Sequence, residues 1–317
     1  MATSGSYNYK LTRDKIIKRA MHRANIVNMN QAARADDHEY AVDIFQGLLK
    51  LWQAEGIQMW KRKQATLFPA KQDEQYAISS STSDHVTNSY VNTTLSAAEA
   101  SGQTILSVTS STGMTAADNV GIELDDGTRQ WTTIASVDSS TQITVDVALT
   151  DDAASGNTVV TYTSKINDRP LRILDMRSVD IANDKNSIPM QMIGYDEYFN
   201  IPVKTTDGRP NNFYYDKLLD NGQIYLFPRP DEVNQVIEFT YHEQWQDVDN
   251  STDDIDIPQE WTLPLIYGLA AELAVAYGKF QEFQILEGKA REYKETVRQF
   301  DNDEADFHIL PDTGECC

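Results

Sequence analysis

Cysteine is almost missing from this sequence of 317 residues, since Cys316 and Cys317 are its only two and they are adjacent. Adjacent cysteines cannot connect distant parts of a fold, and no zinc-ligand spacing is present. The five histidines are scattered, and the sequence contains no glycine-rich phosphate loop, nucleophile elbow or HExxH motif. We therefore expect no disulfide framework, no metal site, no cofactor and no catalytic residues.

Long hydrophobic runs are also missing. The most apolar window, residues 263–277, contains Glu272 and is shorter than the roughly 20 residues that cross a bilayer. No charged and then apolar leader opens the sequence. These features predict a protein that is made in a cytoplasm and has no membrane partner.

Basic residues are scarce, and the formal net charge is −21. Between residues 73 and 164 the only Lys or Arg is Arg129, whereas residues 1–72 carry more basic than acidic side chains. A predominantly acidic surface repels nucleic-acid phosphates, so tight DNA binding is not expected. The same excess of acid could simply keep the protein soluble.

Helical patterns occur at both ends of the sequence. Thr12 is a plausible N-cap for a first helix, and a second runs from Asp36 to Glu55, where Gly56 ends it. A closing pair of helices surrounds Gly278. The apolar stripe expected on the second helix is Tyr40, Ile44, Leu48, Leu51 and Trp52.

Strand patterns occupy the middle of the sequence. Asn221-Gly222 between apolar alternations predicts a hairpin turn, because both residues tolerate positive φ. A third strand near residues 236–241 would complete a three-stranded β-meander.

Residues 85–164 are rich in Ser, Thr, Asp and Gly. Five short alternating runs within them indicate an inserted small β-barrel or sandwich. The expected fold class is therefore α+β: a helical core, a β-meander and this inserted domain. The expected divisions are 1–84, 85–164, 165–300 and an acidic tail, 301–317.

An acidic run spans residues 247–260. Counted from Asp249, its oxygen-bearing side chains partly follow the spacing of an EF-hand loop, but Asp254 stands where that loop requires glycine. A solvated linker is the favoured interpretation.

A series of motifs resembles a known family. They are Pro189, the segment 193–198, Gly208-Arg-Pro, Tyr214-Tyr215-Asp216, the run from Ile224 to Pro230, Phe239-Thr-Tyr, and Pro258 before the closing helices. Together they resemble the head-to-tail adaptors of short-tailed bacteriophages, also called tail tubular protein A, over residues 10–80 and 165–300. Nothing in the shorter family pattern requires the β-insert.

The resemblance implies a non-enzymatic virion protein at the portal-proximal end of the tail. It implies a homo-oligomeric ring of about a dozen copies that docks under the portal protein, attaches the tail nozzle or tail tube, and lets DNA pass during ejection without binding it specifically. A tail spike, a fibre or the capsid is a candidate partner for the β-insert.

Two sets of residues are candidates for these contacts. Leu265, Leu269, Leu273, Tyr277, Phe307, Ile309 and Leu310 are expected at the portal or subunit interface, and Tyr214, Tyr215, Tyr225 and Arg229 on the tail-facing meander. The competing hypothesis is a virion protein that binds cell-wall glycan through the β-insert, where Trp131 could stack on a sugar, or that cleaves it with a carboxylate pair.

Overall fold

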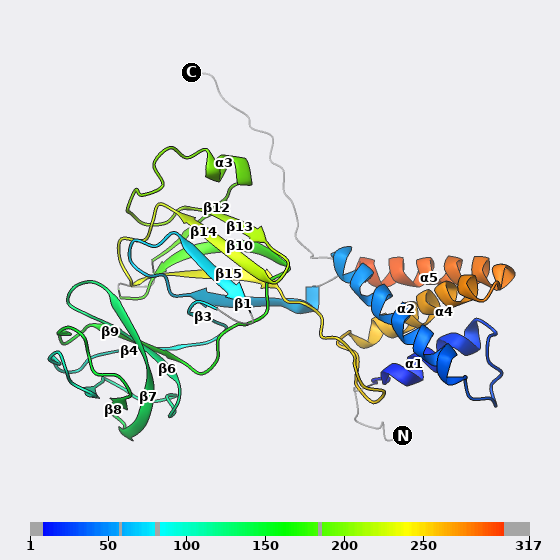
Figure 1. The fold of residues 1–317 in the computed structure, drawn as a ribbon, viewed down its shortest axis with the longest axis horizontal. Coiled ribbons are helices and arrows are strands. Elements are labelled where there is room, and N and C mark those ends of the chain that lie inside the picture. The colour runs from blue at the N-terminus through cyan, green and yellow to red at the C-terminus, as the bar shows by residue number, and fades with distance from the viewer. Residues whose placement is uncertain (1–8, 57–58, 80–82, 183–185, 301–317) are drawn as a thin grey trace, which may run out of the picture. The chain divides into compact units, whose positions relative to one another are not determined.

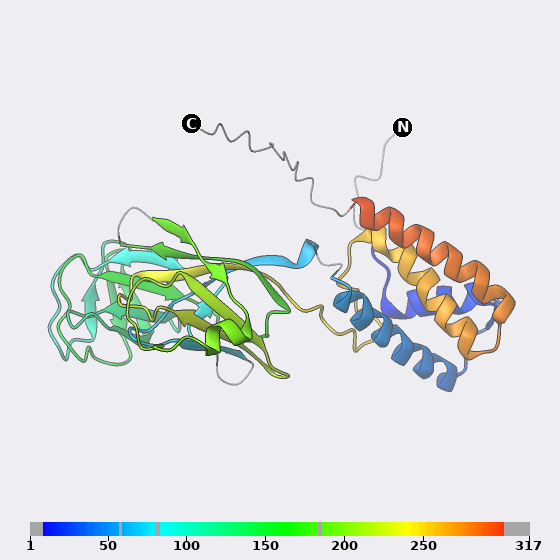
Figure 2. The same ribbon diagram turned by 90° about the horizontal axis from the view of Figure 1, so that it is seen from above.

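The computed structural model describes residues 9–56, 59–79, 83–182 and 186–300 of an α+β chain (Figure 1). The chain divides into two compact units. The helical unit comprises the described parts of Met1–Trp60 and Trp245–Cys317, and the sheet unit comprises those of Lys61–Gln244. Figure 2 shows the same ribbon from a second direction, with α1, α2, α4 and α5 in one unit and the sheets in the other.

The helical unit contains four helices: α1 (Arg13–Arg23), α2 (Ala35–Ala54), α4 (Thr262–Ala276) and α5 (Phe280–Phe300). The 3-10 turn η2 (Gln259–Trp261) leads into α4, and η1 (Met59–Lys61) follows α2. Thr12 is the N-cap of α1, as expected, and has extended backbone, but its side chain makes no capping hydrogen bond. Gly56 after α2 and Gly278 between α4 and α5 have φ of +84° and +69°, which glycine adopts without steric cost.

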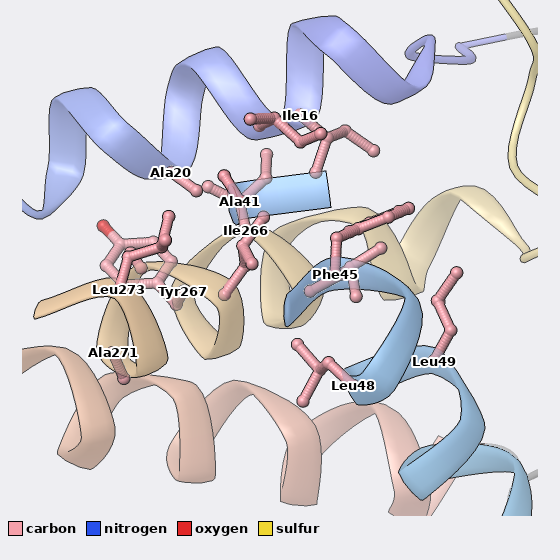
Figure 3. Close-up of a cluster of buried hydrophobic side chains, with 14 of the residues drawn as sticks. Ile16, Ala20, Ala41, Phe45, Leu48, Leu49, Ile266, Tyr267, Ala271 and Leu273 are labelled. Carbon is pink, nitrogen blue, oxygen red and sulfur yellow. The ribbon is translucent and has the colours of Figure 1, made fainter. Parts of the chain in front are cut away.

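One core of apolar side chains holds the helices together, and Figure 3 shows part of it. Ile16 and Ala20 of α1, Phe45 of α2 and Leu273 of α4 meet there, all between 0% and 2% exposed. The sequence of α4 is apolar on most sides, and α1, α2 and α5 all pack against it. Burying this helix stabilises the unit by about 25 cal/mol for each Å² of apolar surface removed from water.

The buried face of α2 differs from the expected stripe. Leu48 and Trp52 are buried as expected, but Tyr40 and Leu51 are 48% and 56% exposed. Ala41, Phe45 and Leu49 are buried instead. The expectation was wrong because it followed the largest side chains, whereas the tight packing against α1 and α4 requires Ala41.

Two sheets face each other in the sheet unit. One has the strand order β11 (Ser187–Pro189), β10 (Arg172–Asp180), β15 (Gln235–His242), β1 (Arg62–Leu67) and β3 (Val86–Thr87). The other has the order β12 (Gln191–Met192), β13 (Asn212–Lys217), β14 (Asn221–Phe227) and β2 (Gln75–Ser79). Ile237 and Phe239 of β15 share one buried cluster with Phe213 of β13 and Leu226 of β14, which places the core between the two sheets.

The expected three-stranded meander is wrong. β13 and β14 do form a hairpin, but β15 pairs with β1 and β10 in the opposite sheet. The reason lies in Pro228-Arg229-Pro230, since proline cannot donate to a strand ladder and β14 ends at Phe227. The chain then crosses to the other sheet before β15 begins.

The hairpin turn also differs from the expectation. Asn221 and Gly222 already belong to β14, and Gly222 pairs with Lys217, so residues 218–220 make the turn. A Cβ on Gly222 would lie 2.9 Å from Cε2 of Tyr215, closer than a carbon contact allows. Glycine is therefore required at position 222 by the Tyr215 ring and not by a positive φ.

The third sheet is built from residues 91–162. Its strand order is β4 (Val91–Thr94), β9 (Thr158–Tyr162), β6 (Asn119–Glu123), β7 (Arg129–Ser139), β8 (Gln142–Val145) and β5 (Ile105–Ser107), and every pairing is antiparallel. The sheet curls so that Leu106, Val120 and Ile143 meet inside it. A bridge between Leu95 and Val108 joins its two edges.

Aromatic and polar contacts hold this curled sheet against the rest of its unit. Phe68, which follows β1, packs against Trp131 of β7 at a ring-centroid distance of 5.5 Å. Asn234, just before β15, donates from Nδ2 to Oε1 of Glu123 (2.8 Å) and accepts at Oδ1 from Nη2 of Arg129 (3.0 Å). Burial lowers the pKa of this arginine to about 10, and the nearby Glu123 charge opposes that shift. Arg129 therefore makes contacts within the sheet unit and does not serve as a surface cation.

Candidate interaction surface

Five aromatic rings gather on the outer side of the four-stranded sheet, and we call them the aromatic surface. They are Tyr195, Tyr198 and Phe199 of the short helix α3 (Tyr195–Phe199), Tyr214 of β13 and Tyr225 of β14. Tyr195 is 56% exposed and Phe199 41%, whereas Tyr198 is buried beneath them. Large apolar rings are seldom exposed together unless they bind something.

The alternation of the hairpin creates the base of this surface. Successive side chains of a strand point to opposite faces, so Phe213 and Tyr215 enter the core while Tyr214 points outward. Tyr225 alternates in the same way on β14 and is the direct partner of Tyr214 across the hairpin. Their rings stack at a centroid distance of 5.7 Å and an interplanar angle of 25°.

Helix α3 adds the upper layer. Tyr195 and Phe199 are four residues apart, so both lie on one side of the helix, and their rings are 4.4 Å apart. The Tyr198 ring lies 5.1 Å from that of Tyr225, and the Phe199 ring 5.8 Å from it. The aromatic surface is therefore one continuous layer formed by three separate elements.

The border of this layer is mostly acidic. Burial raises the pKa of Tyr198 to about 12, with a smaller contribution from the charge of Glu74. Burial also raises the pKa of Tyr214 and that of Tyr225, and the Asp216 carboxylate raises both further. These hydroxyls remain protonated near neutral pH and can donate hydrogen bonds to a partner.

One cation lies against the rings. Nζ of Lys204 is 5.3 Å from the Phe199 ring centroid and 5.7 Å from that of Tyr198, and it donates to the Phe199 carbonyl oxygen (3.1 Å). This contact ties the loop after α3 to the rings, at cation-π distance. It therefore supports the position of α3 over the hairpin.

Only two of the four expected tail-facing residues lie on the aromatic surface. Tyr214 and Tyr225 belong to the aromatic surface, but Tyr215 is 8% exposed and donates to the carbonyl oxygen of Pro170 (2.5 Å). Nη2 of Arg229 lies 2.7 Å from Oδ1 of Asp207, and its side chain is 18% exposed. Tyr215 and Arg229 therefore make contacts within the unit.

The expected interface residues of the helices lie inside the helical unit. Leu265, Leu269 and Leu273 are between 0% and 1% exposed. Tyr277 is half-buried, and its hydroxyl donates to Oδ1 of Asp37 (2.7 Å). Phe307, Ile309 and Leu310 lie outside the described residues.

Other apolar side chains of the helices face outward. Those of the closing pair are Leu263, Val275, Phe280, Ile285 and Phe300, each between 42% and 81% exposed. The sequence patterns select the buried face of an amphipathic helix and so miss these positions. Tyr195 and Phe199 were missed for a similar reason, although aromatic residues at positions 195, 198 and 199 are a visible signal.

No catalytic arrangement is evident in the described part of the chain. Among those residues no group of three or more His, Cys, Asp and Glu side chains could hold a metal ion, the described acidic linker included. No helix within them is long and apolar enough to cross a membrane. Trp131 is stacked on His85 and packed against Phe68, so it does not offer a free face to a sugar.

The fold and the exposed aromatic layer have the character of a structural binding protein. A family model described as SU10 adaptor protein matches residues 104–308, which is more than half of the chain. The chain therefore belongs to the SU10 adaptor protein family, a phage adaptor family, and is a bacteriophage virion component. A comparison with curated proteins finds no match.

The range of the match differs from that of the resemblance drawn from the motifs. It begins at residue 104, inside the curled six-stranded sheet. Most of that sheet therefore lies within the residues that the family model matches. The first helices, before residue 104, lie outside the match.

Proposed function

We propose that this protein is a non-enzymatic head-to-tail adaptor of a short-tailed phage. Copies of the chain form a ring, of about a dozen as the motifs imply, that docks under the portal protein and extends the DNA channel toward the tail. The observation that carries this proposal is the family match over residues 104–308, together with the exposed aromatic surface.

The helical unit supplies the contacts between copies and with the portal. Leu265, Leu269 and Leu273 build its core, so the outward side chains of the same helices, such as Val275 and Ile285, are the contacting residues in this proposal. Each contact is small. A closed ring uses all of them at once, which turns weak individual contacts into a stable assembly.

The aromatic surface receives the next tail component, a nozzle or tail-tube protein. Aromatic side chains are enriched at the energetic centres of protein interfaces. Because Glu74 and Asp216 lie near the rings, a partner that brings apolar and basic side chains fits best. In this proposal the curled sheet binds a spike, a fibre or the capsid.

Sedimentation velocity with the portal ring of the same virus tests this function. The chain is expected to co-sediment with the portal, and Ile285→Asp is expected to weaken that complex by placing a charge on an apolar contact. Asn186→Asp, an exposed change in the sheet unit, is the control. Failure of the unaltered, folded chain to bind the portal contradicts the proposed function.

A further inference from the structure

A groove between α1 and the start of α4 has a composition suited to an acidic, apolar peptide. It measures about 560 Å³ and is lined by Arg19, His22 and Arg23 of α1, Met29, and Leu263 and Ile266 of α4. Met29 is 82% exposed and Leu263 45%, which makes an apolar floor open to solvent. None of these lining residues is acidic.

The two arginines of the groove are not neutralised within the described chain. Nη1 of Arg19 donates to the hydroxyl of Tyr9 (2.8 Å), a neutral partner. The guanidinium carbon of Arg23 lies 5.2 Å from the ring centroid of Tyr267. Neither forms an ion pair with a described carboxylate, in a protein whose net charge is −21.

Residues 301–310 have the complementary sequence, Asp-Asn-Asp-Glu-Ala-Asp-Phe-His-Ile-Leu. Residues 301–306 carry four carboxylates and no Lys or Arg. Phe307, Ile309 and Leu310 follow at once. Arginines bind carboxylates well. Covering the exposed apolar floor with the side chains of Phe307, Ile309 and Leu310 removes apolar surface from water, which is favourable.

The groove lies within reach of this segment in the same chain. The Tyr267 ring, which contacts Arg23, is also 5.2 Å from the Tyr293 ring of α5. From Tyr293 to Phe300, where α5 ends, the helix advances about 10 Å. Seven further residues span at most about 25 Å, so Phe307 can return to the groove.

We propose that residues 301–310 dock into the α1–α4 groove of their own chain in the free protein. The carboxylates then pair with Arg19 and Arg23, and Phe307, Ile309 and Leu310 cover Met29 and Leu263. This docking goes beyond the proposed function and does not depend on it. It covers the apolar floor and the two arginines of the α1–α4 groove.

Disulfide trapping tests the docking. In a background of Cys316→Ser and Cys317→Ser, the pair Met29→Cys and Phe307→Cys is oxidised under mild conditions in the full-length protein. The control pair joins Phe307→Cys to Leu51→Cys, which is 56% exposed on α2. Leu51 lies one turn before Glu55, the ion-pair partner of Lys294 on α5, so it is similarly reachable.

The docked state predicts a disulfide within one chain that forms about tenfold faster at position 29 than at position 51, because docking raises the local concentration of the two thiols. Equal rates at both positions overturn the proposal. A mixture of the two single-cysteine proteins, Met29→Cys and Phe307→Cys, tests whether the segment docks on a second copy of the chain. Efficient cross-linking between chains means that the segment docks on a second copy, which also overturns it.

A charge-matched pair of variants separates docking from the fold. Arg19→Gln with Arg23→Gln removes the groove cations, whereas Lys15→Gln with Lys18→Gln removes the same charge from exposed positions of α1 outside this groove. The first pair is expected to slow trapping at position 29 several-fold, and the second to leave it nearly unchanged. Equal effects of the two pairs contradict a specific docking site.

Discussion

The imidazole of His85 lies flat on the indole of Trp131, with ring centroids 3.7 Å apart and an interplanar angle of 6°. Nδ1 of His85 is hydrogen-bonded to the hydroxyl of Tyr162 (2.6 Å). His85 precedes β3, whereas Trp131 and Tyr162 belong to the curled sheet. This stack therefore joins two sheets that are built from separate parts of the chain.

The stack makes the stability of the sheet unit depend on pH. Burial, and then the charges of Lys165 and Arg129, lower the pKa of His85 from 6.5 to about 3. Below pH 6.5 the His85 side chain binds a proton in the unfolded chain but stays neutral in the folded one. Stability is therefore lost as the pH falls from about 6.5 to about 3.

We expect a loss on the order of 2 kcal/mol from this one group, after allowance for its partial exposure to solvent. Urea unfolding at pH 7 and pH 4 measures it, and His85→Phe, which keeps an aromatic ring but cannot titrate, should flatten the profile. An unchanged pH dependence in His85→Phe shows that other groups are responsible.

Asn234 should be as important as an apolar core residue for holding the curled sheet. Its side chain bonds Glu123, Arg129 and Thr158, so Asn234→Ala leaves three buried or partly buried groups without that partner. Such a loss costs about 1–3 kcal/mol. Urea unfolding of Asn234→Ala should show this decrease, while the exposed control Asn186→Ala stays within about 0.5 kcal/mol of the parent. Equal stability of the two variants rules out a role for the Asn234 side chain in the joint.

Gly222→Ala should strain the hairpin against Tyr215. The new methyl would lie 2.9 Å from Cε2 of that ring, and overpacking of this kind costs about 1–3 kcal/mol. A double-mutant cycle with Tyr215→Leu checks the cause, because the smaller side chain leaves room for the methyl group. If Gly222→Ala destabilises the Tyr215→Leu protein by the same amount, backbone conformation and not the ring determines the choice of glycine.

Removing the exposed rings should impair binding without unfolding the protein. Tyr195 and Phe199 are both more than 40% exposed but cover Tyr198, so Tyr195→Ser with Phe199→Ser should lower the thermal midpoint while leaving the protein folded. Affinity for the nozzle or tail-tube protein should fall at least about tenfold if these rings are central to the interface. Leu219→Ser, at an 89% exposed turn position, is the matched control, and an equal effect of both changes argues against the aromatic surface.

Local patterns could predict the elements but not all of their partners. Gly56 marks a helix end and the alternation around Tyr214 marks a half-buried strand, both through chemistry that a sequence shows directly. The partner of β15 depends on how the chain crosses after Pro230, which no local pattern encodes. The meander was mispredicted for this reason.

The candidate site was predictable in part for a similar physical reason. The alternation of Tyr214 and Tyr225 placed them outside the core, but only the fold brings α3 above them. The apolar pattern of α4 indicates a buried face, and it cannot tell burial against α1 and α2 from burial against another subunit. Leu269 was therefore assigned to an interface, although it lies in the core of its own unit.

Electron microscopy of the chain mixed with the portal ring of its own virus tests the central claim most directly. The adaptor function predicts a ring of copies stacked coaxially on the portal, with an open channel through both. Portal rings that carry no added layer, beside single folded copies of this chain, would contradict it.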